Sequence, residues 1–375
     1  MEEHISLIHV DRQFQSIKRE VLASIENVLN SGQYILGKEV EQFELEVGQY
    51  LNTAYSVSVA NGTDALVLSL KALGIGKGDE VITTPFTFFA TAEAISRIGA
   101  KPVFVDIDQD SLNIDASYIE AAITSRTKAI LPVHLFGLSC DINKVCQVAK
   151  KHNLFVVEDA CQAFGATNHE LKLGTVGDIG CYSFFPTKNL SSIGDGGLVV
   201  TNNEEIARKI KKLRHHGSTR KYYHDEIGYN SRLDEIHAAI LRICLKKIDL
   251  WNSVRIKRAK KYQSLDGING MKTPKIPASN GSHIYHLYCI EHDHRDDLMD
   301  YLKQHNIASG IYYPIPLHLQ EVYKNLGYKK GDFPVSEQKA DVLLALPMHP
   351  FLSDEEQDRV IKVLQAYKEP GKDDD

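Results

Sequence analysis

No segment of the sequence approaches the run of about 18 apolar residues that a membrane-spanning helix needs. The first ten residues, Met1–Val10, are acidic and polar at their start and lack the apolar core of a secretory signal peptide. We therefore expect a protein that works in the cytoplasm and has no membrane partner.

A concentrated basic face is missing as well. The formal net charge of the 375-residue chain is −6, whereas a protein that grips nucleic acid needs clustered positive charge to neutralise phosphates. We therefore expect no nucleic-acid partner.

Cysteine pairs at metal-binding spacing are also absent. The six cysteines are scattered, none belongs to a Cys-x-x-Cys pair, and no histidine pair accompanies them at the spacing of a zinc site. This pattern is typical of reduced thiols, so we expect no metal centre.

What the chain does have is the size of a two-domain soluble enzyme. We place a large domain, with the N-terminal segment included, at residues 1–250. A small C-terminal α+β domain is expected at residues 251–370, and a disordered tail at residues 371–375.

Short apolar runs alternate with helix-like segments through the first two hundred residues. Most of these runs are near-continuously apolar, as expected of strands that helices cover on both faces. They are Tyr55–Ala60, Glu80–Thr84, Pro102–Asp106, Ala129–His134, Leu154–Asp159, Ile179–Phe184 and Gly197–Thr201. The helix-like segments are Thr63–Leu73, Phe88–Ile98, Ala116–Ile123 and Ile142–His152. The alternation predicts an α/β fold with a largely parallel sheet between helices.

The second half of the chain has a different pattern. A long helical pattern runs from Ser231 toward Tyr262, and the linker candidate Gly267–Ser282 holds three glycines and two prolines. Beyond it we expect strands at Tyr285–Glu291 and near Gly310–Tyr313, and helices at Arg295–His305 and Ser353–Tyr367.

The first candidate binding element, Ala60–Leu66, follows a predicted strand and opens a helix. Gly62 permits close backbone approach, and the Thr63 hydroxyl lies beside free helix N–H groups, so the turn suits a phosphate. A plain helix-capping turn is an equally good interpretation of these residues taken alone.

The second element, Glu158–Gln162, ends an apolar strand. A carboxylate at the end of a buried strand is costly unless it meets a cation or good donors. Asp159 could therefore pair with a protonated pyridine nitrogen and keep the ring an electron sink. The alternative is an acidic cap of the following turn.

The third element is the loop that carries Lys188, between Phe184 and Gly197. About a dozen residues rich in Ser, Asn, Gly and Pro leave little room for a helix, which indicates a functional loop. Partial burial there, next to another cation, would lower the pKa of Lys188 and favour the neutral amine that forms a Schiff base. Ser183 could add a hydrogen bond to a phosphate. Taken alone, however, a single loop lysine is usually just solvated.

In this order, the three elements resemble the DegT/DnrJ/EryC1/StrS sugar aminotransferases, a branch of the pyridoxal-phosphate (PLP) enzymes of fold type I. The resemblance runs from Ser31–Gly37 to Leu346–Met348 and includes Thr84–Phe88, Pro132–Gly137, Gly194–Gly197 and Gly228–Asp234. It implies the PLP-dependent transferase fold type I, with a mostly parallel seven-stranded sheet in the large domain. It also implies PLP as the cofactor and a homodimer with shared active sites.

The resemblance implies two catalytic residues. Lys188 would bind PLP as a Schiff base and then move a proton between the substrate carbon and the cofactor. Asp159 would pair with the pyridinium nitrogen. A minority branch of the family has His in place of the lysine and performs a dehydration, so Lys188 favours transamination.

The remaining cofactor contacts are carried over in the same way. They are Gln162 at the ring hydroxyl, Phe88 on the ring face, Gly62, Thr63 and Ser183 at the phosphate, and Asn230, contributed to the phosphate by the neighbouring subunit. An apolar ring such as that of Phe88 holds the pyridine plane without competing hydrogen bonds. Phe164 departs from the family pattern, which often has His there, and this puts substrate detail in doubt.

Two segments, Arg220–His224 and Gly310–His318, are similar to the subgroup that aminates C3 of dTDP-linked 3-keto-6-deoxyhexoses. Cations suit the pyrophosphate of a nucleotide sugar, and aromatic faces and hydroxyls suit its rings. The second segment could instead be a proline-rich crossing loop. The candidate substrate contacts are Tyr182, Lys221, Tyr222, Tyr223, Tyr313 and His318.

The resemblance thus predicts an aminotransferase that moves an amino group from L-glutamate to a nucleotide-linked keto-deoxysugar. Three alternatives stay open: a C4 aminotransferase of a UDP- or GDP-sugar, a cyclitol aminotransferase, and a non-catalytic regulator with the same fold. Such a regulator usually lacks the lysine or the aspartate, whereas this chain has both Lys188 and Asp159.

Overall fold

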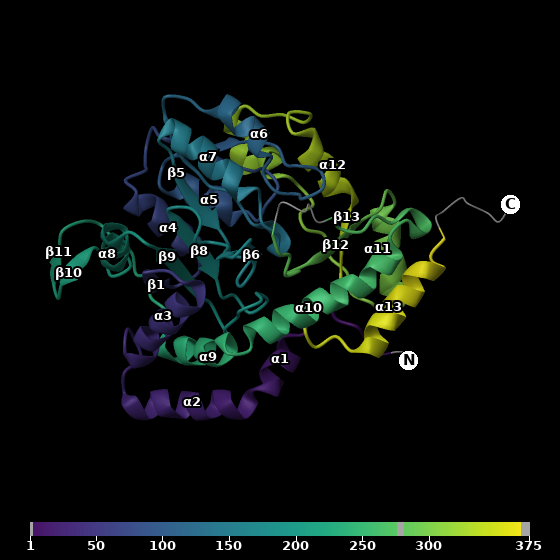
Figure 1. Cartoon of the computed structure of the whole chain (residues 1–375), viewed down its shortest axis with the longest axis horizontal. Coiled ribbons are helices and arrows are strands. Elements are labelled where there is room, and N and C mark those ends of the chain that lie inside the picture. The colour runs from purple at the N-terminus through teal and green to yellow at the C-terminus, as the bar shows by residue number, and fades with distance from the viewer. Residues whose placement is uncertain (1–2, 276–280, 369–375) are drawn as a thin grey trace.

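A seven-stranded sheet forms the centre of the computed structural model, which describes residues 3–275 and 281–368 (Figure 1). Its strands are β1 (Tyr55–Val59), β2 (Glu80–Thr83), β3 (Lys101–Phe104), β4 (Thr127–Ile130), β5 (Phe155–Asp159), β8 (Ile179–Ser183) and β9 (Gly197–Thr201). They lie in the order β1-β9-β8-β5-β4-β2-β3. Each of the seven apolar runs contributes one of these strands, so the predicted α/β fold is confirmed.

The direction of the chain reverses at β9. The strands β2, β3, β4, β5 and β8 run parallel, whereas β9 is antiparallel to both β8 and β1. The connection from β8 to β9, which is described throughout, contains no helix. A parallel neighbour needs a crossover of a dozen or more residues, usually a helix, so this loop returns antiparallel.

Helices cover both faces of the sheet, because successive strand residues point to opposite sides. They are α3 (Lys38–Leu51), α4 (Gly62–Ala72), α5 (Ala90–Arg97), α6 (Ala116–Ile119), α7 (Ile142–His152), α8 (Glu204–Leu213) and α9 (Glu235–Leu245). On one face α4, α5 and α8 pack with residues such as Val81 and Val199. On the other face α3, α7 and α9 pack with the alternate residues, such as Ile82 and Val200.

Two helices, α1 (Val10–Ser16) and α2 (Lys18–Ser31), precede α3. The start of α3 is capped from a distant part of the chain, because Gly37 at its N-cap has no side chain. The buried carboxylate of Glu235 on α9 instead accepts backbone N–H bonds from Gly37 (2.7 Å), Glu39 (2.8 Å) and Val40 (3.0 Å). A negative charge at this helix end is favourable, so the contact stabilises the docking of α3 on α9.

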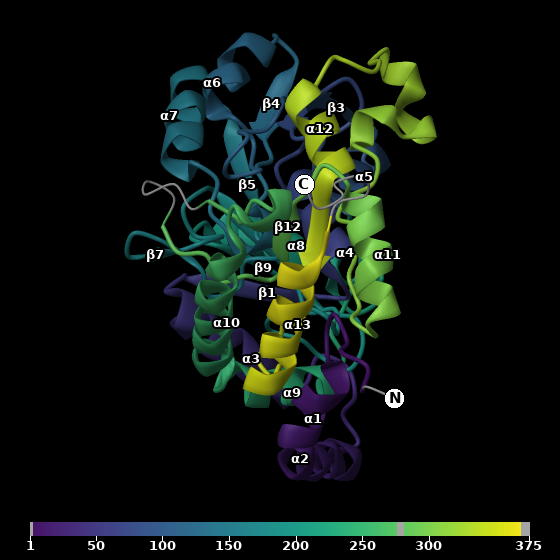
Figure 2. The same ribbon diagram turned by 90° about the vertical axis from the view of Figure 1, so that its right-hand side faces the viewer.

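A smaller antiparallel sheet pairs β12 (Tyr288–Glu291) with β13 (Leu343–Leu346) in the C-terminal part. The helices of this part are α10 (Ile248–Tyr262), α11 (Arg295–Gln304), α12 (Pro334–Val342) and α13 (Asp354–Ala366). Figure 2 shows α10 beside α13, where Arg258 and Lys261 pair with Asp354.

The predicted strand near Gly310–Tyr313 is wrong. Only Gly310 makes an isolated bridge, with Ala345, and β13 takes the place beside β12. Pro314 and Pro316 follow directly, and proline has no N–H to donate to a strand ladder.

The helical pattern from Ser231 toward Tyr262 forms two helices. The first begins at Glu235, and Lys246 and Lys247 separate α9 from α10. The proposed domain boundary after residue 250 falls in the first turn of α10, so this helix connects the two proposed domains.

Some expected features lie outside the described residues. These are residues 276–280 of the proposed linker and the whole tail, residues 371–375. Two small hairpins are described outside the main sheet: β6 (Thr167–Asn168) with β7 (Leu171–Lys172), and β10 (Ser218–Arg220) with β11 (Tyr223–His224). None of the helices in the described part of the chain has the length and hydropathy to cross a bilayer.

Candidate active site

Three predicted cofactor residues meet where β5 and β8 end. The strands end at Asp159 and Ser183, and in their parallel pairing Asp159 lies opposite Cys181. Helix α4 begins at Gly62, where a Cβ would lie 2.6 Å from the Ser183 Cβ and 3.1 Å from the Cys161 Sγ. Only glycine lets the start of α4 lie this close to the end of β8.

The first turn of α4 is an N-terminus with unpaired donors. The side-chain oxygen of Asn61 caps it by accepting from the N–H of Asp64 (2.8 Å). The N–H groups of Gly62 and Thr63 belong to the turn that has no acceptors within a helix. These donors and the helix dipole suit an anion next to Ser183.

Asp159 is buried, and both of its carboxylate oxygens have donors. The hydroxyl of Thr91 donates to Oδ2 (2.8 Å), and the N–H of Cys161 donates to Oδ1 (3.2 Å). The hydroxyl of Thr87 lies 3.1 Å from that of Thr91. A carboxylate has about four lone-pair positions, so Asp159 can still accept a bond from a ring N–H.

A buried network of amides holds the loop that carries Lys188. The side chain of Asn189 donates to Asn252 Oδ1 on α10 (2.8 Å), and its Oδ1 lies 3.2 Å from His286 Nδ1. Because the amide oxygen can only accept, His286 donates from Nδ1. The backbone of Lys188 is therefore tied to α10 through its neighbour in sequence.

Burial lowers the pKa of Lys188, while the nearby Cys161 and Asp159 act in the opposite direction. The side chain is only partly accessible to solvent. The pKa of His286 also lies well below its usual value, first because of burial and then because of the charge of Lys188. Lys188 therefore has a neutral imidazole beside it, and its own neutral, nucleophilic form is favoured.

Gln162 links the cofactor residues to the segment 310–318. Its Oε1 accepts from the N–H of Phe136 (2.8 Å), and its Nε2 donates to the hydroxyl of Tyr313 (3.0 Å). The ring centroids of Tyr313 and Phe88 are 6.2 Å apart. Burial raises the pKa of Tyr313, so its hydroxyl stays protonated at neutral pH.

The fully buried carboxylate of Glu158 connects three segments behind this site through hydrogen bonds. It accepts from the backbone N–H groups of Gly174, Val176 and Gly177 at 2.6–2.8 Å and from His134 Nε2 at 2.8 Å. The N–H of Cys140 donates to His134 Nδ1 (3.2 Å), which leaves the ring proton on Nε2. The ends of β4 and β5 and the segment before β8 are thereby joined.

The hairpin β10–β11 and Asn230 lie on the surface. The hairpin stands beside α8 at the edge of the molecule in Figure 1, with Tyr222 83% and Tyr223 58% exposed. The guanidinium of Arg220 lies 3.6 Å from the ring centroid of Tyr223, and Arg232 donates to Asn230 Oδ1 (2.5 Å). Among the described residues of a single chain, neither the hairpin side chains nor Asn230 contacts the cluster around Lys188.

Two predicted substrate contacts need correction. Tyr182 is fully buried and its hydroxyl donates to the carbonyl of Leu173 (2.5 Å). His318 is also buried, with Nε2 3.0 Å from a Glu337 oxygen. Both side chains are enclosed by protein, so neither is available to a substrate. Phe164, the departure from the family pattern, likewise lies in the core.

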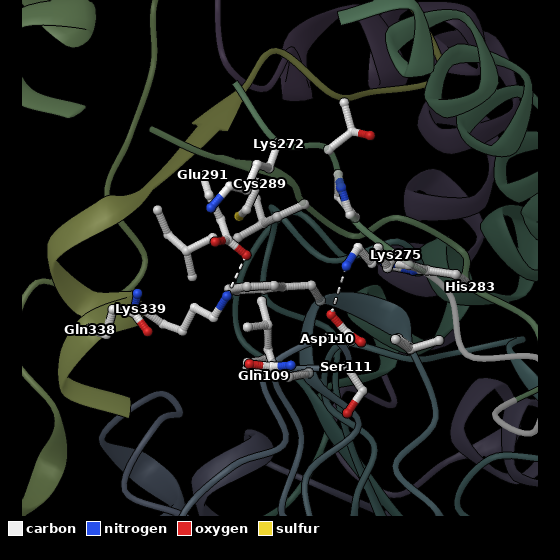
Figure 3. A pocket seen from close by; sticks show the side chains of 18 residues that line it. Gln109, Asp110, Ser111, Lys272, Lys275, His283, Cys289, Glu291, Gln338 and Lys339 are labelled. Carbon is white, nitrogen blue, oxygen red and sulfur yellow. Dashed lines mark hydrogen bonds and ion pairs between the residues drawn. The ribbon is translucent and has the colours of Figure 1, made fainter. Parts of the chain in front are cut away.

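A separate cavity of about 180 Å³ lies beside β12 and α12 (Figure 3). Two ion pairs border it, Lys339 with Glu291 and Lys275 with Asp110 (3.3 Å). None of the predicted site residues lines this cavity, so it is distinct from the cluster around Lys188.

A model of the DegT/DnrJ/EryC1/StrS aminotransferase family matches residues 15–365. The chain belongs to this family. Lys188, predicted from the sequence as the Schiff-base lysine, lies in the loop after β8, and Asp159, the predicted partner of the ring nitrogen, ends β5. The family named from the sequence is therefore confirmed.

Three curated relatives cover nearly the whole chain. A pleiotropic regulatory protein of Geobacillus stearothermophilus is 44% identical over 97% of this chain and 99% of its own. A UDP-N-acetyl-3-dehydro-α-D-glucosamine 3-aminotransferase of Acidithiobacillus ferrooxidans is 44% identical over 96% and 97%. A dTDP-3-amino-3,4,6-trideoxy-α-D-glucose transaminase of Streptomyces venezuelae is 39% identical over 97% and 96%.

Solved structures agree with the fold. DesV of S. venezuelae, in complex with a ketimine intermediate, superposes with a TM-score of 0.95 at 39% identity, covering 97% of this chain and 98% of its own. NtdA of Bacillus subtilis with bound PMP gives a TM-score of 0.91 at 33% identity, covering 97% and 85%. The PLP-dependent transferase fold is therefore confirmed.

The protein is a sugar aminotransferase with PLP as its cofactor. The residues present fit that group, because a helix N-terminus with free donors, a buried carboxylate and a lysine of lowered pKa lie within one cluster. No group of acidic, histidine and cysteine side chains in the described ranges could hold a metal ion.

Sequence reasoning did not identify several residues that the structure places in this cluster. Thr91 donates to Asp159, and Asn189, Asn252 and His286 support the lysine loop. Only Thr91 had a usable signal, since it lies four residues after Thr87, which belongs to the motif Thr84–Phe88 that contains the predicted ring-stacking residue.

Proposed function

We propose that the protein transfers the amino group of L-glutamate to C3 of a nucleotide-linked keto sugar, with a dTDP-3-keto-6-deoxyhexose as the favoured acceptor. The observation that carries this proposal is the position of Lys188. Its pKa is lowered by burial, and it lies among Asp159, Gly62 and Ser183 where neighbouring strands end. Such an arrangement suits a nucleophilic amine next to a phosphate site and an acidic partner.

Lys188 and Asp159 carry the chemistry in this proposal. PLP, when bound, supplies an electron sink for negative charge that develops at the substrate carbon. The Nζ of Lys188 would hold the cofactor, and it would also be the group that takes up the proton at the substrate carbon or returns it. Asp159 would keep the ring nitrogen protonated by accepting its N–H, and the donors Thr91 and Cys161 hold the carboxylate in place.

The other proposed contacts orient the cofactor. Phe88, 55% exposed, offers its ring as a flat stacking surface. Gln162 would contact the ring hydroxyl, and Tyr313 keeps that amide oriented by accepting a hydrogen bond from its Nε2. The phosphate would be bound by three groups: the N–H groups at the start of α4, the Ser183 hydroxyl and the partner subunit's Asn230. The site is thus complete only in a homodimer.

The choice of substrate rests on relatives and on the hairpin. Two of the three relatives named above are named for 3-amino chemistry, one on a UDP-linked and one on a dTDP-linked sugar. Lys221, Tyr222 and Tyr223 provide a cation and two exposed rings, which suit the pyrophosphate and rings of a nucleotide sugar. We assign these three residues, with Tyr313, to the substrate.

The test is a panel of keto-sugar nucleotides mixed with the PMP form of the purified protein. The dTDP-linked 3-keto-6-deoxyhexose should convert PMP to PLP fastest, measured as growth of the PLP absorbance. A 4-keto isomer and the UDP- and GDP-linked sugars serve as matched acceptors. Faster conversion by another acceptor would reassign the substrate, and no conversion by any of them would contradict the proposal.

The second candidate is a UDP-sugar 3-aminotransferase, which the A. ferrooxidans relative favours. In that case the UDP-linked 3-keto sugar leads the same panel. A purely regulatory role is opposed by the presence of both Lys188 and Asp159. Turnover of the bound cofactor on addition of L-glutamate separates the enzyme from a regulator.

A further inference from the structure

Two buried threonines, Thr87 just before α5 and Thr91 in its first turn, form a one-way chain of hydrogen bonds toward Asp159. The Asp159 carboxylate can only accept hydrogen bonds. The Thr91 hydroxyl therefore donates its single hydrogen to Oδ2 (2.8 Å). The hydrogen in the 3.1 Å contact between the two threonines must then come from Thr87. The order is therefore Thr87 to Thr91 to Asp159.

The same turn also carries the residue proposed to stack on the cofactor ring. The N–H of Thr91 donates to the carbonyl of Phe88 (3.2 Å). Thr91 thus contacts Asp159 through its side chain and Phe88 through its backbone. The two residues proposed to contact the cofactor ring, Asp159 and Phe88, are therefore both hydrogen-bonded to Thr91.

We propose that Thr91, oriented by Thr87, is a positioning residue that holds the Asp159 carboxylate toward the ring nitrogen of the cofactor. This inference rests on the proposed function, which places that nitrogen at Asp159. A carboxylate can rotate about its last side-chain bond unless both oxygens have donors. Thr91 holds Oδ2, and the N–H of Cys161 holds Oδ1.

Hydrogen bonds to an ionised acceptor are stronger than neutral ones, so the loss of the Thr91 hydroxyl has a measurable consequence. The carboxylate then turns, and its bond to the ring N–H weakens. Contacts to the phosphate and to Lys188 remain. The loss should therefore be selective for ligands that carry a ring nitrogen, whereas a packing defect would weaken every ligand alike.

The experiment compares two ligands of the apoprotein by equilibrium dialysis: PLP, and its 1-deaza analogue with CH in place of the ring nitrogen. In Thr91→Val, which replaces the hydroxyl by a methyl group, the Kd of PLP should rise about tenfold and that of the analogue by less than about twofold. Thr91→Ser restores the hydroxyl and should bind both ligands as the native protein does. Thr87→Val should shift PLP in the same direction, but less.

The matched control is Thr83→Val, because Thr83 is equally buried and its hydroxyl donates to the carbonyl of Leu131 (2.8 Å). It should leave the ratio of the two Kd values unchanged. Thr91→Ala provides a second variant if the valine protein is insoluble. Equal weakening of both ligands in the Thr91 variants, or no weakening of PLP, would overturn the inference.

Asp159→Asn separates this inference from the proposed function. If it leaves the Kd ratio at the native value, Asp159 does not serve the ring nitrogen and the proposed role of Asp159 fails. If it changes the ratio while Thr91→Val does not, only the positioning role of Thr91 fails. The pH dependence of the bound-cofactor absorbance, recorded for the same variants, gives a second readout that packing alone would not move.

Discussion

The surroundings of the lysine loop and the β10–β11 hairpin differ in how their candidate functional side chains are held by the rest of the chain. Around the loop, Asp159, Asn189 and Gln162 each have partners on distant segments at 2.8–3.2 Å. The hairpin leaves Tyr222 83% exposed. Its aromatic rings contact mainly basic side chains beside them in sequence.

The difference indicates where each region finds its partners. Asp159, Asn189 and Gln162, in and around the loop, are already oriented by the fold, as expected of groups that perform chemistry at defined geometry. The aromatic side chains of the hairpin have few contacts within their own chain that would fix their orientation. Their proposed partners are therefore outside it: the nucleotide sugar and the second subunit.

The largest expected effect is that of Lys188→Ala. Removing the amine should lower kcat by at least about 1,000-fold, because no other group at this position can bind the cofactor and move the proton. Borohydride reduction followed by peptide mapping should locate the cofactor on residue 188 of the native protein and nowhere in the variant. Trapping on a different lysine in the native protein would contradict the assignment.

The next effect tests whether the surface residue Asn230 serves the other subunit. Asn230→Asp should impair activity through repulsion of the phosphate. After random exchange with Lys188→Ala chains, half of the dimers are mixed and each has one intact site, so about a quarter of native activity should return.

Size-exclusion chromatography of differently tagged chains measures the exchange for this mixture. Activity equal to the mean of the two separate variants would show that Asn230 acts within its own chain or not at all. The hairpin region would then need no partner subunit for cofactor binding.

A moderate effect is expected at the hairpin itself. Lys221→Ala should raise the KM for the nucleotide sugar about tenfold with little change in kcat, as expected for a substrate contact that is the same in the ground and transition states. The KM for L-glutamate should not move. Lys330→Ala, at another exposed lysine, is the matched control, and equal effects of both would point to net charge instead of contact.

The smallest effect concerns pH. Because burial lowers the pKa of Lys188 below its usual 10.5, its neutral, reactive form is lost only as the pH falls through this lower value. The rate of recombination of apoprotein with PLP should therefore reach half its maximum below pH 10.5. N-acetyl-lysine amide with PLP gives the reference curve. Coincidence of the two curves would show that the loop does not activate the lysine.

Much of the fold followed from local patterns. Each strand of the main sheet overlaps an apolar run, and the absence of a helix between β8 and β9 followed from the composition of the loop. The strand expected near Gly310 did not form because only Gly310 pairs with β13, through Ala345, and the prolines at positions 314 and 316 have no N–H to extend that pairing.

The candidate site was less predictable from the sequence. The roles of Lys188 and Asp159 came from family resemblance, because a lone loop lysine has many uses. Thr91 was missed because its acceptor is distant in sequence and only the fold brings them together. Tyr182 was misassigned because alternate residues of a strand face opposite sides, and this one faces the core.

Strand β1 has consequences for synthesis on the ribosome. Its sheet neighbour is β9, so residues 55–59 have no strand to pair with until residues 197–201 have been made. Helix α4 follows β1 directly, and a Cβ at Gly197 would lie only 2.3 Å from the carbonyl oxygen of Asn61. The emerging N-terminal third therefore has a strand edge with unpaired backbone groups, which favours binding by chaperones over early folding. The start of α4, which is proposed to bind the phosphate, acquires its final surroundings only when more than half of the chain has emerged.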